Sequence, residues 1–320
     1  MTADTRAGRA VGDPSGNAGH APGAAGDGGA GDGAGRKIEF YHPDRTLPVS
    51  VTGQACGLNC AHCGGHYLEG MVPASEALDR VVDGVPGGAG AGPRYSSCLI
   101  SGGCDSAGKV PVLREVELLR SLKRLGLRLN FHTGLVSRDE AAEIGRLADH
   151  VSFDLVGDDE TVREVFGVSA TAADYFAAYE ALSAHARVTP HVCIGLRGGR
   201  ISGELRVLDY LAGRWRGSGG SEPGQVVFIV FTPTRGSLYE NRTPPAPEDV
   251  ASVVRRARRV MPGVNLKLGC MRPGGRYRPV VDVLCMDAGV DGVVNPAREA
   301  EEHARRLGLD VVARRECCVL

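Results

Sequence analysis

Three cysteines stand close together in one short stretch that follows an apolar run. Cys56, Cys60 and Cys63 are spaced C-x3-C-x2-C, so their thiolates can converge on a single inorganic cluster held by one loop. Structural zinc sites need four ligands, often in two separated pairs. Three thiolates leave one iron of a four-iron cluster without a protein ligand, and that iron can hold a small molecule. The spacing therefore favours an iron–sulfur cluster used for chemistry, with a zinc knuckle or three unrelated buried thiols as the alternatives.

Further cysteines follow predicted strands or end the chain, and we expect them to supply a second iron–sulfur cluster. They are Cys104, Cys193, Cys270, Cys317 and Cys318. Such a cluster needs about four thiolates, or three and another ligand, and forms here only if the carboxy-terminal segment folds back over the barrel mouth. The alternative is that each is an ordinary buried cysteine, as we expect of Cys98 and Cys285. The terminal four residues also have the form of a prenylation box, without a polybasic stretch.

Two polar residues and a glycine end other predicted strands. His132 could ligate a cluster, touch substrate or fill a polar corner. Asp154 could bond a cofactor or substrate, or cap the following helix. Gly195 follows Cys193 at the end of the fifth strand.

Two arginines also follow predicted strands, and each could hold a carboxylate by two hydrogen bonds. They are Arg235 and Arg272. For Arg235 a surface ion pair is equally expected. Arg272 stands close to Cys270, so we expect it, together with Cys104, Cys193 and Cys270, to take part in catalysis.

The elements that must position these residues alternate between short β-rich runs and amphipathic helical stretches. The predicted strands are 49–52, 98–101, 127–132, 151–154, 188–194, 226–231, 266–269 and 292–294. The predicted helices are 74–82, 112–125, 137–148, 172–185, 204–211, 247–260 and 296–307. This alternation predicts parallel βα units, in a (β/α)8 TIM-type barrel or a close variant such as a shorter, open barrel. Chemistry in such barrels sits at the carboxyl ends of the strands, where the unusual residues fall.

Composition limits the class of protein. The 320 residues carry a net charge of -1, which gives no electrostatic footprint for nucleic acid. No apolar run is long enough to span a membrane, and the cysteine pattern suggests reduced thiols in the cytoplasm. Residues 1–35 are rich in Gly, Ala and Asp, so we expect a disordered tail ahead of one domain, residues 36–320, whose carboxy-terminal segment closes the barrel mouth.

The stretch around the three cysteines resembles the signature of the radical SAM superfamily. The resemblance implies a four-iron, four-sulfur cluster on Cys56, Cys60 and Cys63, whose open iron binds S-adenosylmethionine. His62 stands where an aromatic residue often touches the adenine. Ser101, Gly102 and Gly103 resemble the glycine pair that meets the methionine amino group, and glycine lets backbone approach a ligand closely. Cofactor contacts are therefore expected from these residues, from Asp154 and from Gly195.

Within that superfamily the chain is most similar to the biotin synthase-like branch, and several motifs resemble components of a two-protein lipoyl synthase. The motifs lie at 101–105, 190–196, 268–273, 292–296 and 317–318. The resemblance implies a sulfurtransferase that takes hydrogen from an octanoyl chain and inserts sulfur at the unactivated carbon. The expected partners are the lipoyl carrier domain with that chain, a companion radical SAM protein, and a ferredoxin or flavodoxin-type reductant. His132 replaces a cysteine of biotin synthase, which argues against dethiobiotin as the substrate.

Two other functions stay open on the residues alone. One is a radical SAM enzyme without sulfur insertion, such as an isomerase or a metallocofactor maturase, in which the extra cysteines bind no cluster. The other is a non-enzymatic iron–sulfur or zinc module, which would not cleave S-adenosylmethionine.

Overall fold

The strands of the described residues, 36–83, 94–220 and 224–320 of the computed structural model, form one parallel sheet. Their order across the sheet is β11-β1-β10-β9-β8-β7-β6-β5-β4-β2-β3. The strands are β1 Lys37–Tyr41, β2 Thr46–Ser50, β3 Val72–Pro73, β4 Ser97–Ser101, β5 Arg128–His132, β6 His150–Asp154, β7 Val188–Ile194, β8 Gln225–Val230, β9 Asn265–Leu268, β10 Gly292–Val294 and β11 Asp310–Arg314. The predicted disordered segment 1–35 lies outside the described residues.

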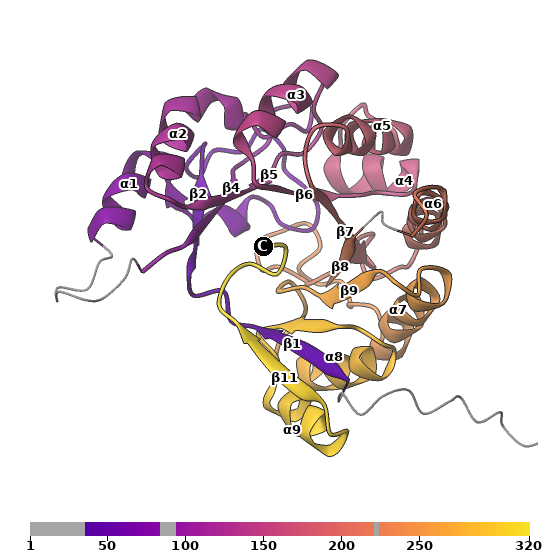
Figure 1. The fold of residues 1–320 in the computed structure, drawn as a ribbon. Coiled ribbons are helices and arrows are strands. Elements are labelled where there is room, and N and C mark those ends of the chain that lie inside the picture. The colour runs from indigo at the N-terminus through magenta and orange to yellow at the C-terminus, as the bar shows by residue number, and fades with distance from the viewer. Residues whose placement is uncertain (1–35, 84–93, 221–223) are drawn as a thin grey trace, which may run out of the picture. The chain divides into compact units, whose positions relative to one another are not determined.

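Helices connect the strands and cover the outside of the curled sheet (Figure 1). The α-helices are α1 Ala74–Asp83, α2 Val116–Arg124, α3 Arg138–Leu147, α4 Asp159–Thr161, α5 Ala172–Ser183, α6 Glu204–Gly217, α7 Pro247–Val260, α8 Tyr277–Asp287 and α9 Arg298–Arg306. Short helices of other types are η1 His66–Leu68, η2 Val112–Glu115 and η3 Val162–Phe166. A capping box begins α3, because Ser137 and Glu140 each accept a hydrogen bond from the other's backbone N–H.

The sheet curls around a hollow without closing on itself. In the described part of the chain β3 pairs only with β2, and β11 pairs only with β1. The predicted barrel or close variant is therefore confirmed as the open variant. All eight predicted strands are present, whereas β1, β3 and β11 were not predicted. The link between the last two predicted strands, which looked irregular in sequence, contains α8.

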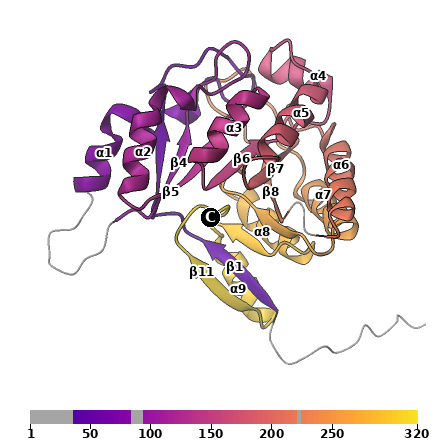
Figure 2. The same cartoon turned by 45° about the horizontal axis from the view of Figure 1, so that its top comes forward.

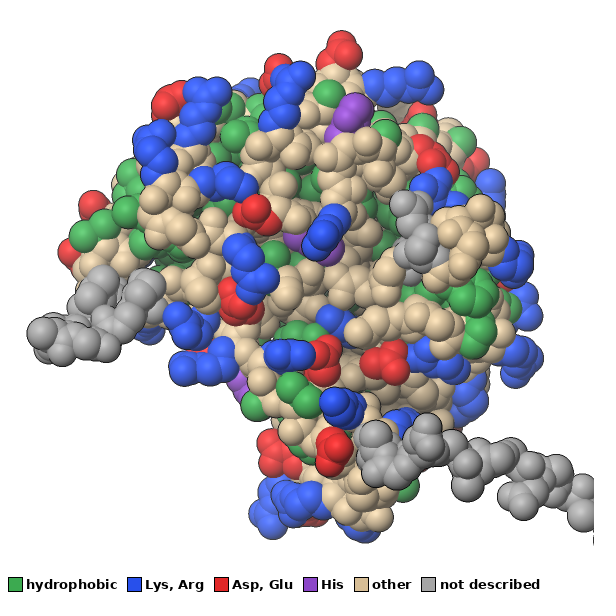
Figure 3. Space-filling model, in the orientation of Figure 1, with side chains coloured by type: hydrophobic (Ala, Val, Ile, Leu, Met, Phe, Trp, Pro, Cys, Tyr) green, Lys and Arg blue, Asp and Glu red, His purple; other side chains and the backbone are tan. Residues whose placement is uncertain are grey.

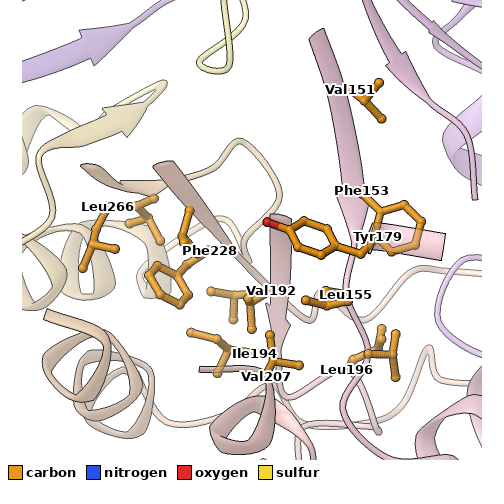
Figure 4. Packing of buried hydrophobic residues seen from close by; sticks show 14 of the residues in the cluster. Val151, Phe153, Leu155, Tyr179, Val192, Ile194, Leu196, Val207, Phe228 and Leu266 are labelled. Atoms are coloured by element: carbon orange, nitrogen blue, oxygen red, sulfur yellow. The ribbon is translucent and has the colours of Figure 1, made fainter. Parts of the chain in front are cut away.

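Alternate residues along each strand face opposite sides of the sheet, and this separates an apolar core from a polar interior. Figure 4 shows Phe153, Val192 and Ile194 packed with Tyr179 of α5 and Val207 of α6. All five are at most 2% exposed. This outer layer between strands and helices is the core, where Cys98 and Cys285 are also fully buried as predicted.

The carboxy-terminal segment, residues 316–320, lies inside the ring of strands, and Figure 1 shows the chain ending there. After β11, which runs beside β1 (Figure 2), the backbone N–H of Cys317 donates to Thr46 Oγ1 at 2.8 Å. Gln225 Nε2 donates to the carbonyl of Val319 at 3.1 Å. Thr46 and Gln225 are the first residues of their strands, whereas Tyr41 and Val294, which pack with Cys318 and Val319, are the last residues of β1 and β10. The predicted closure of the barrel mouth by this segment stays a prediction.

The surface shown in Figure 3 carries Lys and Arg side chains interspersed with Asp and Glu. This mixture agrees with the net charge of -1, and this face shows no extended basic region. Among the described residues no helix is long and apolar enough to cross a membrane.

A buried ion pair ties together the carboxyl ends of β9 and β10. Arg272 is 2% exposed, and its guanidinium donates to Asp282 of α8 through Nε at 2.6 Å and Nη2 at 2.9 Å. Its other bonds reach the carbonyls of Gly269, Val294 and Asn295. The structure thus gives Arg272 a positioning role, because its donors are already taken and a substrate carboxylate would have to displace one of them.

Replacing Asp282 with Ala should therefore lower the free energy of unfolding by about 3–5 kcal/mol, because the Arg272 charge stays buried without its counter-ion. Urea unfolding measures the change. Glu302→Ala, which breaks the exposed Arg298–Glu302 pair, is the matched control and should cost about 0.5 kcal/mol or less. A loss for Asp282→Ala no larger than the control would contradict this account.

Candidate functional site

The carboxyl ends of the strands form one edge of the sheet, the rim, because every strand runs in the same direction. The predicted site residues that end β4, β5 and β6 lie there, namely Ser101, His132 and Asp154. The cysteine loop follows β2 at the same edge. The positions of these residues confirm that the rim collects them, as parallel strands require.

Backbone hydrogen bonds from two other segments hold the cysteine loop in place. The backbone N–H of Ala61 donates to the Val165 carbonyl at 2.7 Å, and the N–H of Tyr239 donates to the Ala61 carbonyl at 2.8 Å. The Sγ atoms of Cys60 and Cys63 and a ring nitrogen of His62 lie within 4.8 Å of one another. A hydrogen bond from the Cys60 thiol stabilises the Cys63 thiolate and lowers the pKa of Cys63 to about 4. The loop thus offers ionised sulfur for a metal or cluster.

The glycine pair after β4 packs directly under this loop. Gly103 donates its backbone N–H to Thr52 Oγ1 at 2.7 Å. A Cβ on Gly103 would lie 2.1 Å from the Ala55 carbonyl oxygen and 2.6 Å from Cys56 Cα. A Cβ on Gly102 would lie 3.0 Å from Thr52 Oγ1. Glycine is needed here for backbone approach to the cysteine loop, and the predicted contact of Ser101, Gly102 and Gly103 with a cofactor stays a prediction.

Cys104 contacts the cysteine loop. Its carbonyl accepts from the Gly57 N–H at 2.6 Å. Burial raises the pKa of its thiol to about 12, and the neighbouring Cys56 acts in the same direction. The cluster that Cys104 was predicted to share with Cys317 and Cys318 stays a prediction.

His62 lies beside the loop at the edge of a cavity. Its ring meets Tyr67 edge-on at 6.1 Å and Phe166 at 5.8 Å between centroids. The cavity measures about 170 Å³. Its lining is mostly apolar and includes Leu155, Leu196, Val207, Ile229, Phe231 and Met271. A small set of polar groups in an apolar cavity is typical of ligand sites.

Polar side chains of neighbouring strands face one another inside the ring. His132 Nε2 lies 3.5 Å from Asp154 Oδ2, and the His132 and His191 ring centroids are 5.8 Å apart. Burial opposes ionisation of both members of the pair, but their mutual attraction outweighs it. The pKa of Asp154 falls to about 2 and the pKa of His132 rises above its usual value. His191, the residue that sequence reasoning missed, alternates with Cys193 along β7, and that spacing was the available signal.

Cys193 lies near the end of β7, and Gly195 begins the tight loop that follows this strand. Gly195 has φ of 74°, and a Cβ there would lie 2.8 Å from Pro245 Cδ. Its N–H donates to Glu204 Oε1 at 2.7 Å. Burial raises the pKa of both Glu204 and Cys193. Nothing in the sequence indicated Glu204, since its hydrogen bond with Gly195 forms only when residues 195–203 turn back towards β7.

Both terminal cysteines contact one apolar cluster, Cys318 as a buried member and Cys317 as a partly buried neighbour. Cys318 is 6% exposed and packs with Tyr41, Val227 and Val294. Cys317 accepts a hydrogen bond from Asn130 Nδ2 at 3.7 Å, and a hydrogen bond from the Cys318 thiol lowers the pKa of Cys317 to about 7.

Cys270 lies after β9, and burial raises its pKa, with the negative charge of Cys317 acting in the same direction. Among the described residues, only Cys60, His62 and Cys63 form a group of three ligand atoms within 4.8 Å. The second cluster therefore stays a prediction. The folded chain holds Cys317 inside the ring, which also weakens the prenylation alternative.

The residues around the cavity fit a polar small molecule beside a cluster. His62 Nδ1 and Asp154 Oδ1 are buried without a hydrogen-bond partner, and both residues line the cavity. A buried polar atom without a partner is costly, so a bound group that bonds both would relieve that cost. This is the observation by which the site fits S-adenosylmethionine next to Cys56, Cys60 and Cys63.

No family model matches this chain, and no curated protein matches it either. Solved structures do match. The FeFe-hydrogenase maturase HydG from Carboxydothermus hydrogenoformans aligns with a TM-score of 0.57 at 16% identity, over 81% of this chain. Another HydG structure aligns at 0.59 and 15% identity over 85% of this chain. Methylornithine synthase (PylB) aligns at 0.53 and 17% identity, over 86% of this chain and 84% of its own. The chain has the fold of these proteins. It spans 58% and 63% of the two HydG chains.

Replacing Gly103 with Ala should displace the cysteine loop, because the added methyl group meets backbone atoms that cannot rotate away. We expect anaerobically reconstituted protein to lose at least about half of its loop-bound iron while the circular dichroism spectrum is unchanged. Gly70→Ala is the matched control, since a Cβ at Gly70 meets nothing within 4 Å. Equal iron content in the two variants would show that the close approach does not position the loop.

The His132–Asp154 attraction should make stability depend on pH. Asp154, with its lowered pKa, adds stability above its unfolded pKa that is lost only as pH falls towards about 2. His132, with its raised pKa, adds stability below about pH 6.5 that is lost as pH rises through its folded pKa. His132→Gln should therefore cost cofactor-free protein more stability at about pH 5.5 than at about pH 9. Because both side chains are partly exposed, at 34% and 44%, we expect a difference of about 1 kcal/mol or less. Equal costs at both pH values in urea unfolding would refute the pairing.

Proposed function

We propose that this chain is a radical SAM enzyme. The observation that carries the proposal is the loop of Cys56, Cys60 and Cys63, braced at the rim and adjoining a cavity with two unpaired buried polar atoms. The fold supports it, because HydG and methylornithine synthase are radical SAM enzymes. At these low identities the likeness concerns the fold, so the activity rests on the site residues.

In this proposal Cys56, Cys60 and Cys63 hold a four-iron, four-sulfur cluster. Together with S-adenosylmethionine such a cluster supplies a carbon radical that takes hydrogen from an unactivated C–H bond. The chain itself contributes position and a dry environment. The backbone bonds of Ala61 keep the cysteine loop in place, and the apolar lining of the cavity excludes water. His62 and Asp154 offer hydrogen-bonding groups to the bound molecule.

We infer further that the reaction is sulfur insertion into an octanoyl chain on a lipoyl carrier domain, with this chain as one component of a two-protein lipoyl synthase. Cys317 and Cys270 support a second cluster, because both lie in the ring and the charge of each acts on the pKa of the same neighbour, Cys318. Cys317 is the better ligand of the terminal pair, since Cys318 is packed in an apolar cluster. His132 lies close enough to Cys317 to affect its pKa and is a candidate non-thiol ligand.

A radical SAM enzyme without sulfur insertion is the second candidate. The shared fold of a hydrogenase maturase and methylornithine synthase favours it. This candidate requires one cluster and no thiolated product.

Replacing Cys56, Cys60 and Cys63 together with Ala should abolish reductive cleavage of S-adenosylmethionine and leave the barrel folded, because these three side chains are not members of the main hydrophobic cluster. The measurement is 5′-deoxyadenosine production by reduced protein. Cys285→Ala, in the core of α8, is the control and should retain cleavage. Continued 5′-deoxyadenosine production by the triple variant would end the radical SAM proposal.

Replacing Cys317 with Ala distinguishes the two candidate functions. For sulfur insertion we expect about eight irons per chain in the intact protein and about four in Cys317→Ala. That variant should keep cleavage and lose the thiolated octanoyl product. Cys318→Ala is the matched control and should keep both iron and product. If Cys317→Ala retains all its iron and still inserts sulfur, the ligand assignment fails; if the intact protein holds only about four irons and makes no thiolated product, the second candidate holds.

A further inference from the structure

The carboxy-terminal segment, residues 316–320, is held by side chains from strands all around the ring. Thr46 of β2 and Gln225 of β8 bond its backbone, as described above. Lys267 of β9 is 5% exposed, and its Nζ donates to the Cys318 carbonyl at 2.6 Å. Asn130 of β5 reaches the Cys317 thiol. Burying a polar side chain costs free energy unless it forms hydrogen bonds. The carboxy-terminal segment provides those hydrogen-bond partners, so these strands form a binding site for it.

Glu316 fixes the point where the segment enters the ring. It accepts a hydrogen bond from Ser96 Oγ at 2.8 Å and pairs with Arg128 at the start of β5. Apolar contacts hold the other end, where Cys318 and Val319 pack with Tyr41, Val227 and Val294. The segment thus crosses the hollow, from the first residues of β2, β5 and β8 to the last residues of β1 and β10.

The depth of the segment in the hollow follows from its contacts with the strands. Cys317 contacts Asn130, and His132 lies two residues further along β5. At about 3.3 Å rise per residue, the segment lies roughly 7 Å from the layer of His132 and Asp154, measured along β5. Ile229 joins the two levels, because it lines the cavity and also packs against the cluster that contains Cys318 and Val319. The apolar wall of the cavity therefore continues down to the terminal residues.

We propose that residues 316–320 are the floor of the reaction chamber and determine how deeply an aliphatic chain penetrates it. This assignment of a specificity-determining element rests on the proposed function only for the identity of the natural substrate. The lining favours an aliphatic chain, since its surface is mostly apolar. Leu320, the last residue, is half-buried against the same apolar cluster as Ile229, so it is the side chain to shorten.

The test measures the binding of saturated fatty acids of about 6 to 14 carbons to cluster-loaded protein by calorimetry. Each buried methylene strengthens binding about fourfold, so affinity should rise with length and stop rising where the chain meets the floor. We call the acid length at which the affinity stops rising the break. In Leu320→Ala, and in a chain that ends at Cys318, the break should move to longer acids. An acid two carbons beyond the original break should then bind about tenfold tighter than to the intact protein.

Leu307→Ala is the matched control, because Leu307 is 48% exposed at the end of α9, outside the ring, and it should leave the break unchanged. Leu320→Ala keeps the test valid if the shortened chain fails to fold. The floor is overturned if the break stays at one length in every variant, or if no fatty acid binds. Failure of the proposed function is distinguishable: the break would move as expected while no thiolated product forms on the octanoyl carrier.

Discussion

The close approach of Gly103 to Ala55 and Cys56 is the contact on which the site depends. It exists because β2 and β4 are adjacent parallel strands paired from Thr46–Ser97 to Ser50–Ser101, which brings the chain segments that follow them together at the rim. A parallel sheet brings every carboxyl strand end to one edge. Only the missing Cβ of Gly103 lets the segment after β4 pass close to the cysteine loop that follows β2. The cysteine loop, the cavity beside it and the polar layer below are all placed relative to that contact.

Strand alternation explains how one fold carries both an aliphatic core and a polar interior. Phe131 and Phe153 face the helices, whereas Asn130, His132 and Asp154 face the hollow. In closed barrels bulky branched side chains fill the interior in layers. Here polar side chains replace part of that filling, and the chain's own end occupies the space they leave. The interior thus presents polar groups as well as packing surfaces.

The sequence predicted the parts of the fold that depend on local patterns. Eight runs of β-rich residues became strands, and the Ser137–Glu140 capping box formed because both partners lie within one turn. The cysteine loop was equally local, as its three thiols lie within eight residues. The strand β1 was missed because its partners, β10 and β11, lie about 250 residues away. The position of residues 316–320 depends on Thr46, Gln225 and Lys267, which share no spacing, and the contact between Cys104 and Gly57 depends on the path of the cysteine loop. No periodicity could reveal such long-range relations.

The pairing of β1 has a consequence for how the protein is made. This strand is the first described element of the chain, yet in the described residues its backbone pairs only with β10 and β11, near the other end. During synthesis the edges of β1 stay without these partners until residues 292–314 have left the ribosome. Unpaired strand edges invite pairing with other chains, and long-range parallel pairing is slow. Newly made chains are therefore most prone to aggregate late in synthesis, which makes this interval the point at which a chaperone would be of most use.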